Sequence, residues 1–144
     1  MNEIKYQIPS GDDKLAPIRG TEHAAGIDFK ASEEVIIPAH STAIIKTGVI
    51  CEIPEGYVGL LAIRSSMAAK KRFMMANGVG IIDADFRGEI GVIIYNAAPE
   101  AQTIEKYQRI AQMVISPFYM ATPVNSQNLS ETARGEGGYG STGQ

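Results

Sequence analysis

Five short runs of β-favouring residues, separated by turn signals, constrain the fold of this chain most strongly. They are EEVIIP, TAIIKTGVICEIP, YVGLLAIR, EIGVIIYN and RIAQMVISPFYM, rich in Val, Ile and Tyr and mostly closed by Pro, Gly or Asn. VGLLAI and IGVIIY are apolar at successive positions, so we expect these two strands to lie between layers. The pattern predicts an all-β domain, either a sandwich, a jelly roll or a barrel.

Only one segment favours a helix. SSMAAKKRF, after Arg64, combines Ala, Met and Lys with a serine suited to cap the first turn. From Asn125 the composition turns polar, and the chain ends in RGEGGYGSTGQ, a glycine-rich stretch that no helix or strand can use. We therefore expect a single domain over residues 1–144, with a β body over 1–133 and a mobile C-terminal arm over 134–144.

Charge and cysteine content exclude several classes of function. The 13 basic and 16 acidic residues give a net charge of −3, which argues against a surface that holds nucleic acid. The single cysteine, Cys51, lies in an apolar stretch and is expected to be buried, inert and kept in a reducing compartment. No segment has the length of a membrane span or the pattern of a signal peptide, so we expect a cytoplasmic protein, in a bacterium or in a virus-infected host.

Two clusters of polar residues have the chemistry of a ligand site. In AIRSSMAAK, Arg64 and two serines stand at the entrance to the predicted helix, where backbone N–H groups attract anions; alternatively, the serines only cap the helix. In NGVGIIDADFRGEIGV, glycines would let a ligand approach a tight hairpin. Asp85 and Gly88 are explained as turn residues of that hairpin. The turn does not explain Asp83, which directly follows an Ile-Ile pair. We interpret Asp83 as a buried functional acid.

Two further clusters give weaker evidence for a ligand site when each is considered alone. Asp28, a lone carboxylate in AAGIDFKA, is able to orient a hydrated metal ion, but the sequence has no metal-ligand motif, so a divalent cation would arrive with phosphates. The glycine-rich tail is not a phosphate-binding P-loop, because serine stands where the lysine belongs. It is either a disordered tail or a nest of phosphate donors with Tyr139 stacked on a base. Together the four clusters indicate a nucleoside polyphosphate ligand.

Five motifs in this order, AAGIDFKA, RSSMAAK, GIIDADFRGEIGV, YQRIAQMVI and RGEGGYGSTG, resemble those of the trimeric dUTPases and extend from Ala24 to Gly143. The resemblance implies a distorted jelly roll of the β-clip type, assembled as a homotrimer whose three active sites lie at subunit interfaces. Each site would be built from three chains, the third donating its C-terminal arm. The implied reaction is dUTP plus water giving dUMP and pyrophosphate with Mg²⁺, which keeps uracil out of DNA and supplies dUMP for dTMP synthesis.

The resemblance also implies roles for individual residues. Asp83 would be the general base that activates water for attack on the α-phosphorus, and Asp28 would hold a water on a Mg²⁺ bound mainly by the triphosphate. Uracil would be read by Asn77 and the backbone of Gly80, Ile81, Ile82 and Asp83, and the deoxyribose would pack on Phe86. The phosphates would be contacted by Arg64, Ser65, Ser66, Gln112 and Arg134, while Tyr139 stacks on uracil and Gly140, Ser141 and Thr142 close over the substrate.

Four positions depart from the family pattern. Ile27, Ser66 and Tyr139 replace the usual tyrosine, glycine and phenylalanine. Phe86 replaces the tyrosine under the deoxyribose, so discrimination between deoxy and ribo substrates could differ. The related dCTP deaminases carry a catalytic glutamate where Ile93 stands, and isoleucine cannot shuttle protons, so we reject deamination. A non-catalytic nucleotide sensor is the other alternative; the presence of both Asp83 and the arm favours catalysis.

Overall fold

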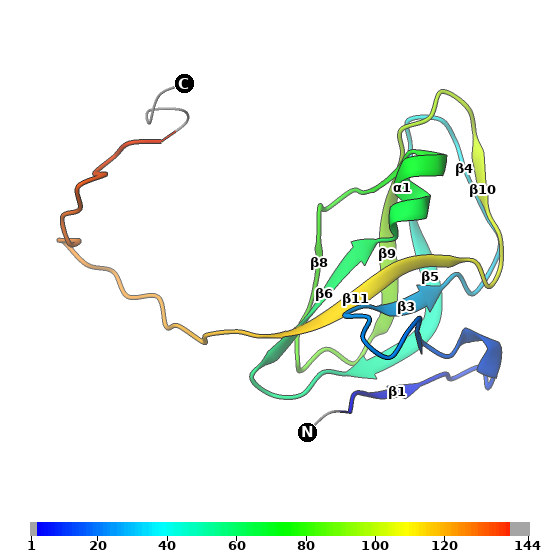
Figure 1. Ribbon diagram of the computed structural model, residues 1–144, viewed down its shortest axis with the longest axis horizontal. Helices are drawn as coiled ribbons and strands as arrows, with labels where there is room; N and C mark the ends of the chain where they lie inside the picture. The colour runs from blue at the N-terminus through cyan, green and yellow to red at the C-terminus, as the bar shows by residue number, and fades with distance from the viewer. Residues whose placement is uncertain (1–2, 139–144) are drawn as a thin grey trace.

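The computed structural model describes residues 3–138 and consists mainly of antiparallel strands. Two sheets pack face to face, and a two-stranded sheet lies at one end beside the single α-helix (Figure 1). The prediction of an all-β domain with one short helix is confirmed. The five predicted β runs contain the strands β4, β5, β6, β9 and β11.

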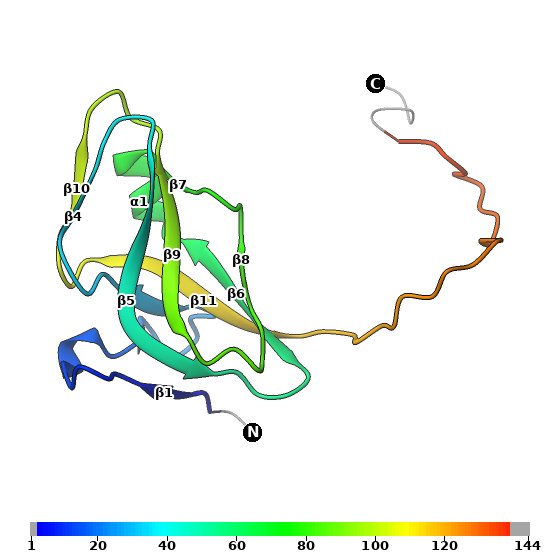
Figure 2. The same ribbon diagram turned by 180° about the vertical axis from the view of Figure 1, so that it is seen from behind.

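The first large sheet, called here the β5–β9 sheet, has the strand order β1-β5-β9-β7 (Figure 2). Its strands are β1 (Lys5–Gln7), β5 (Thr42–Glu52), β9 (Glu89–Asn96) and β7 (Phe73–Met75). The second, the β6–β11 sheet, has the order β2-β3-β11-β6-β8. Its strands are β2 (Ile18–Arg19), β3 (Ile27–Lys30), β11 (Arg109–Pro117), β6 (Tyr57–Ile63) and β8 (Gly80–Ile82). The small sheet pairs β4 (Val35–Ile37) with β10 (Gln102–Ile104).

The core lies between the two large sheets, where side chains alternate inward and outward along each strand. On β9, Ile90, Val92 and Ile94 are fully buried, and burying each such side chain contributes about 1.5–3 kcal/mol. The expectation that β6 and β9 lie between layers is wrong for the single chain. Among the described residues there are only two large layers, so the outward apolar side chains of these strands, such as Leu60 and Ile93, remain partly exposed.

A bulge in β5 lets this long strand serve two neighbours. The pairing register of β5 with β9 shifts between Lys46 and Ile50, and the three residues of β5 from Ile50 to Glu52 pair with β1. Inside the bulge, the Thr47 hydroxyl donates to the carbonyl of Ile90 at 2.6 Å, and Gly48 has a φ of 72°. A bulge of this kind bends its strand, and here it brings β1 onto the edge of the sheet.

The helix α1 (Ser65–Lys71) begins directly after Arg64, which occupies the N-cap position without a side-chain capping hydrogen bond. The expectation that a serine caps this helix is therefore wrong; Ser65 and Ser66 are the first two helical residues, and both are exposed. Met67 is the buried residue of α1. At the other end, the Lys71 ammonium donates to the carbonyl of Thr103 at 2.9 Å, which ties the helix to β10. A short 3-10 turn, η1 (Asp13–Leu15), precedes β2.

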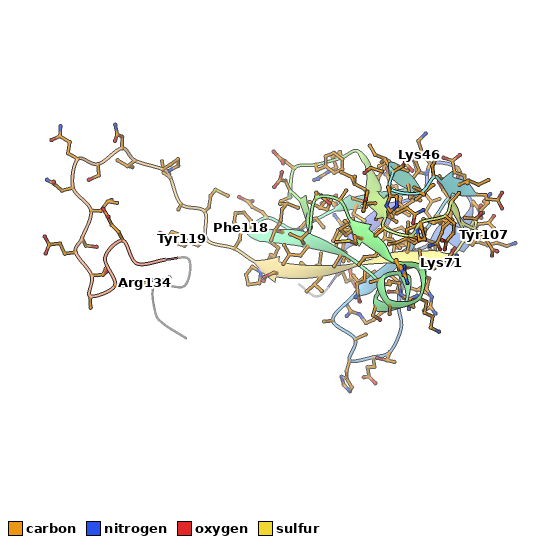
Figure 3. All side chains as sticks on the ribbon, turned by 90° about the horizontal axis from the view of Figure 1, so that it is seen from above. Lys46, Lys71, Tyr107, Phe118, Tyr119 and Arg134 are labelled. Atoms are coloured by element: carbon orange, nitrogen blue, oxygen red, sulfur yellow. The ribbon has the colours of Figure 1, made fainter. Side chains whose placement is uncertain are left out.

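The chain leaves the body after β11. The Phe118 N–H still donates to the Gly56 carbonyl at 3.2 Å, but Tyr119 and Leu129 are about nine-tenths exposed. In Figure 3, Phe118, Tyr119 and Arg134 follow one another along an extension that points away from Tyr107 and Lys71 at the far end of the body. The extended segment thus starts at Phe118, earlier than the boundary after Ala133 expected from composition. The predicted site residues Tyr139, Gly140, Ser141 and Thr142 lie outside the described residues.

Cys51 is 1% exposed in the core, in keeping with its apolar sequence context. Burial disfavours the thiolate and raises the pKa of the Cys51 thiol to about 11. The thiol is thus protonated at neutral pH and a poor nucleophile. None of the helices within residues 3–138 has both the length and the apolar character needed to cross a membrane.

Candidate active site

A buried carboxylate held between two arginines forms the centre of one half of the site. Asp28, on β3, is 6% exposed. The Arg109 Nη1 donates to Asp28 Oδ2 at 3.1 Å, and the Arg64 Nε lies 3.2 Å from Asp28 Oδ1. Both arginines reach the carboxylate from neighbouring elements: Arg109 opens β11, and Arg64 directly follows β6. The pairing offsets the cost of burying a charge.

Two predicted phosphate ligands lie beside this cluster. Gln112 on β11 is the cross-strand partner of both Asp28 and Ala62, so its side chain shares the outer face of the β6–β11 sheet with Asp28. Gly26 makes room for it, because a Cβ atom there would lie 3.1 Å from the Gln112 Cβ and closer still to its Oε1. Ser65 follows Arg64 with its hydroxyl at the surface. The structure thus brings Asp28, Arg64, Ser65 and Gln112 together.

The hairpin predicted over residues 77–92 is not present. β8 pairs with β6, whereas β9 pairs with β5 and β7, so residues 83–88 carry the chain from one large sheet to the other. The sequence could not show this, because β8 finds its partner about twenty residues earlier in the chain. β8 is the edge strand of its sheet, and its second edge has no strand partner in the described part of the chain. Its backbone is therefore available to a planar ligand, with Asn77 exposed in the preceding turn.

Asp83 directly follows β8 and is exposed in the single chain, so the interpretation of Asp83 as a buried acid is wrong for the isolated subunit. Among the residues that the structure describes, the buried acid is Asp28. The Asp83 carbonyl accepts from the Phe86 N–H at 3.2 Å and closes a turn. The Arg87 guanidinium reinforces that turn, because its Nη1 donates to the carbonyls of Ala84 at 2.7 Å and Phe86 at 2.9 Å. Asp83 lines an open surface cavity of about 680 Å³ with Glu55, Phe118 and other residues.

The two halves of the site are separated along β6. Gly80 pairs with Leu61 and Ile82 with Gly59, so Asp83 lies opposite Val58 at the start of β6, whereas Arg64 follows its end. Six residue steps along a strand correspond to about 20 Å. A general base must come within hydrogen-bond distance of the water it activates. Within one chain, therefore, Asp83 does not reach a phosphate held at Arg64.

Comparisons with known proteins identify the family of the chain. The family model named dUTPase matches residues 12–143. The chain belongs to the dUTPase family. A deoxyuridine 5'-triphosphate nucleotidohydrolase of Debaryomyces hansenii is 43% identical over 135 residues, covering 92% of this chain and 83% of the relative. One of Rickettsia bellii is 45% identical over 129 residues, covering 88% and 86%.

Solved dUTPases share the architecture. A mutant dUTPase of Staphylococcus bacteriophage 80alpha, solved with dUpNHpp, has a TM-score of 0.91 at 29% identity, over 100% of both chains. A mutant dUTPase of phage phi11 of S. aureus, whose structure reveals the coordination of a structural Mg(II) ion, has a TM-score of 0.81 at 26% identity, covering 90% of this chain and 100% of the other. The likeness confirms the jelly roll.

The donor set of this dUTPase does not form a metal cage. Within residues 3–138, no group of three or more His, Cys, Asp or Glu side chains is placed to hold a cation. The Asp28 carboxylate lies beside the predicted phosphate ligands, and both of its oxygens already face arginines. Each such oxygen keeps a further lone pair, so Asp28 is able to accept from a metal-bound water. This fits a Mg²⁺ whose other ligands come from a triphosphate.

Three residues outside the predicted site residues contribute to the site: Arg109, Gly26 and Gly88. Arg109 lies in the motif YQRIAQMVI, in which the resemblance implies a role for Gln112 alone. A lone carboxylate inside an apolar strand needs a cationic partner. This requirement is the signal in the sequence that points to Arg109. Gly26 and Gly88 act only through the absence of a Cβ, beside Gln112 and Phe86 respectively. A glycine in a sequence does not show which neighbour needs its space.

Proposed function

We propose that this chain, a dUTP diphosphatase by family, hydrolyses dUTP to dUMP and pyrophosphate at a site shared between subunits. The observation that carries the proposal is the division of the predicted site residues into two groups on one chain. Arg64, Ser65 and Gln112 form a phosphate-binding group at one end of β6, and Asp83 stands at the other end. A second copy of the chain supplies the missing half.

In the proposed reaction, the Asp83 carboxylate accepts a proton from a water as the water attacks the α-phosphorus. The α-phosphorus–oxygen bond to the β-phosphate breaks, and pyrophosphate leaves. Arg64 holds the phosphates, with hydroxyls from Ser65 and Ser66 and the amide of Gln112, and stabilises the charge that develops on them. A base placed in this way contributes about 10²–10⁴-fold to the rate.

Base and sugar recognition are assigned to the segment around β8. The unpaired edge of β8, from Gly80 to Ile82, offers backbone donors and acceptors to uracil, with Asn77 beside them. The Phe86 ring, 41% exposed, offers a face for the deoxyribose. Ile93, on the outer face of β9, provides no proton-transfer group, which argues against deamination.

A homotrimer with three shared sites follows from the family resemblance. It is supported by the outer face of the β6–β11 sheet, which carries apolar side chains between the two halves of the site. Ile81 is 55% and Val114 36% exposed there, and both pair with Leu60. An apolar face of this kind is typical of a surface covered in an assembly.

The arm is proposed to complete the site from a third subunit. The chain from Pro117 to Arg134 can extend over roughly 55 Å, enough to reach another subunit. Arg134 would contact the γ-phosphate and Tyr139 would stack on uracil, with Gly140, Ser141 and Thr142 over the phosphates. Mg²⁺, when bound to the triphosphate and to a water held by Asp28, would neutralise phosphate charge. In the cell, the reaction would keep uracil out of DNA and supply dUMP for dTMP synthesis.

The direct test is pyrophosphate release from dUTP with Mg²⁺, compared with UTP, dTTP and dCTP. Asp83→Asn is expected to keep affinity for a non-hydrolysable dUTP analogue and to lower turnover by about 10²–10⁴-fold. Asp85→Asn removes a carboxylate from the same turn and serves as the matched control, with turnover near that of the wild type. Equal turnover in Asp83→Asn and the wild type would remove Asp83 from the role of base.

A further inference from the structure

Arg109 occupies a position on β11 that regular strand alternation would not give it. In a regular strand, Arg109 would share the inner face with Ala111 and Met113. The register against β3 shifts between Arg109 and Ala111, and the consecutive residues Ile110 and Ala111 are both fully buried. This bulge turns Arg109 to the outer face, where it pairs with Lys30 and reaches Asp28.

The two arginines engage Asp28 in different ways. Arg109 donates a hydrogen bond to Oδ2 at 3.1 Å, whereas the Arg64 Nε lies at ion-pair distance, 3.2 Å, from Oδ1. The Arg64 guanidinium makes no hydrogen bond with good geometry to any residue between 3 and 138. Arg64 is thus held by charge while its donors remain available, and the cluster of one carboxylate and two guanidinium groups keeps a net positive charge.

We propose that Arg109 is a positioning residue for phosphate binding, which anchors the Asp28 carboxylate so that Asp28 holds Arg64 without consuming its donors. The proposal rests on the proposed function, because it assumes that Arg64 binds the substrate's phosphates. Arg109 itself does not contact the substrate. Its side chain is 43% exposed, but its hydrogen bond is directed at the buried carboxylate.

The physical reason lies in the cost of an unpaired buried carboxylate. If Arg109 is removed, Asp28 still needs hydrogen bonds, and Arg64 is the remaining cation at its side. Arg64 then turns toward Asp28 and forms a bidentate ion pair with its carboxylate, the geometry that arginine and carboxylate prefer. Those donors are no longer directed at phosphate. A supporting residue of this kind fixes the geometry of the group that binds the ligand.

The test is the affinity for a non-hydrolysable dUTP analogue, measured by calorimetry without Mg²⁺, together with KM and kcat for dUTP. For Arg109→Gln we expect binding to weaken about tenfold, the scale of one charge-assisted contact, and KM to rise in proportion while kcat changes less than about twofold. Lys46→Gln, the same loss of charge at an exposed position of the opposite sheet (Figure 3), is the control and should bind as the wild type does.

A double-mutant cycle separates positioning from direct contact. In the Arg64→Gln background, Arg109→Gln should weaken binding less than about twofold, because the donors that Arg109 protects are already gone. Additive losses would mean that Arg109 contacts phosphate itself and would overturn the proposal. Arg109→Lys retains the charge and should recover part of the affinity; if Arg109→Gln does not fold, this variant decides, and binding equal to the wild type counts against the proposal.

Failure of the inference is distinguishable from failure of the proposed function. A wild-type protein that neither binds the analogue nor releases pyrophosphate from dUTP contradicts the function. A wild-type protein that does both, with an Arg109→Gln variant of unchanged affinity, contradicts only the positioning role.

Discussion

At the scale of single residues, the missing Cβ of Gly88 determines where the Phe86 ring lies. A Cβ added at Gly88 would lie 2.8 Å from Cε2 of that ring and closer still to Cζ. The φ of Gly88 is not positive, so alanine meets no backbone strain there. The requirement for glycine is thus set by the ring alone, and it makes Gly88 a determinant of the surface that we propose for the deoxyribose.

Gly88→Ala is expected to displace the Phe86 ring and to lower kcat/KM for dUTP by roughly tenfold, since misplacement of a substrate-positioning group is costly. The ratio of kcat/KM for dUTP over UTP should change with it, which a loss of stability alone would not produce. Gly20→Ala, where an added Cβ meets nothing within 4 Å, is the control. The smaller Phe86→Leu side chain should reduce the effect of Gly88→Ala; an unchanged dUTP/UTP ratio would contradict the role.

Cys51 gives the stability of the protein a dependence on alkaline pH. Its thiol pKa is about 11 in the folded chain against 9.0 for a free thiol. Between these values the unfolded chain has lost the proton and the folded chain retains it, so stability falls as pH rises from about 9 to 11 and the contribution is fully present below pH 9. Compared with Cys51→Val, the wild type should lose more of its free energy of unfolding in that window. Parallel pH profiles of urea denaturation for the two proteins would contradict this.

At the scale of elements, the bulge in β5 needs a glycine for two separate reasons. Gly48 has a φ of 72°, and an added Cβ would lie 2.7 Å from Cδ1 of the buried Leu15. Gly11 has nearly the same φ, 70°, but an added Cβ there meets nothing within 4 Å. Alanine substitutions at Gly11 and Gly48 therefore separate the cost of backbone strain from the cost of a steric clash in the core.

Gly11→Ala should lower the free energy of unfolding by about 1–2 kcal/mol, the cost of left-handed backbone for a residue with a Cβ. Gly48→Ala should lower it by about 2–4 kcal/mol, because Leu15 must also move. Urea denaturation at one fixed protein concentration measures both, since stability of an oligomer depends on concentration. Equal losses in the two variants would show that Leu15 accommodates the added methyl group.

The strands that the sequence predicted are those whose signal is local. Thr42–Glu52 and Glu89–Asn96 read as strands because their own residues favour extended backbone. The pairing of β8 with β6 depends on residues far apart in sequence, so the local pattern around Asp83 predicts a hairpin that the structure of this segment does not contain. Serine prefers the N-cap position, so the sequence predicts that one of the two serines caps the helix. The N-cap is instead Arg64, whose side chain makes no capping hydrogen bond. The bulge that turns Arg109 outward has no sequence signal of its own.

At the scale of the whole molecule, the apolar outer faces and the divided site have one explanation. VGLLAI and IGVIIY led to an expectation of burial on both faces, and in the single chain one face of each stays partly exposed. Residues such as Leu60 on β6 lie between the cluster around Arg64 and the position of Asp83. In the proposed homotrimer, a neighbouring subunit that covers this face would bring its own Asp83 toward the arginine cluster. The same packing would bury the apolar surface and complete the site.

Mixing two inactive variants tests this arrangement. Arg64→Gln and Asp83→Asn should each lower dUTP turnover by at least about 10²-fold as pure proteins. When the two are co-refolded so that subunits mix at random, a site whose Arg64 and Asp83 come from different chains is intact in about a quarter of cases. Turnover should then recover to about a quarter of the wild-type value per site. The two variants refolded separately and then combined without exchange are the control and should stay inactive. If every site took both residues from one chain, mixed trimers would be as inactive as the pure variants.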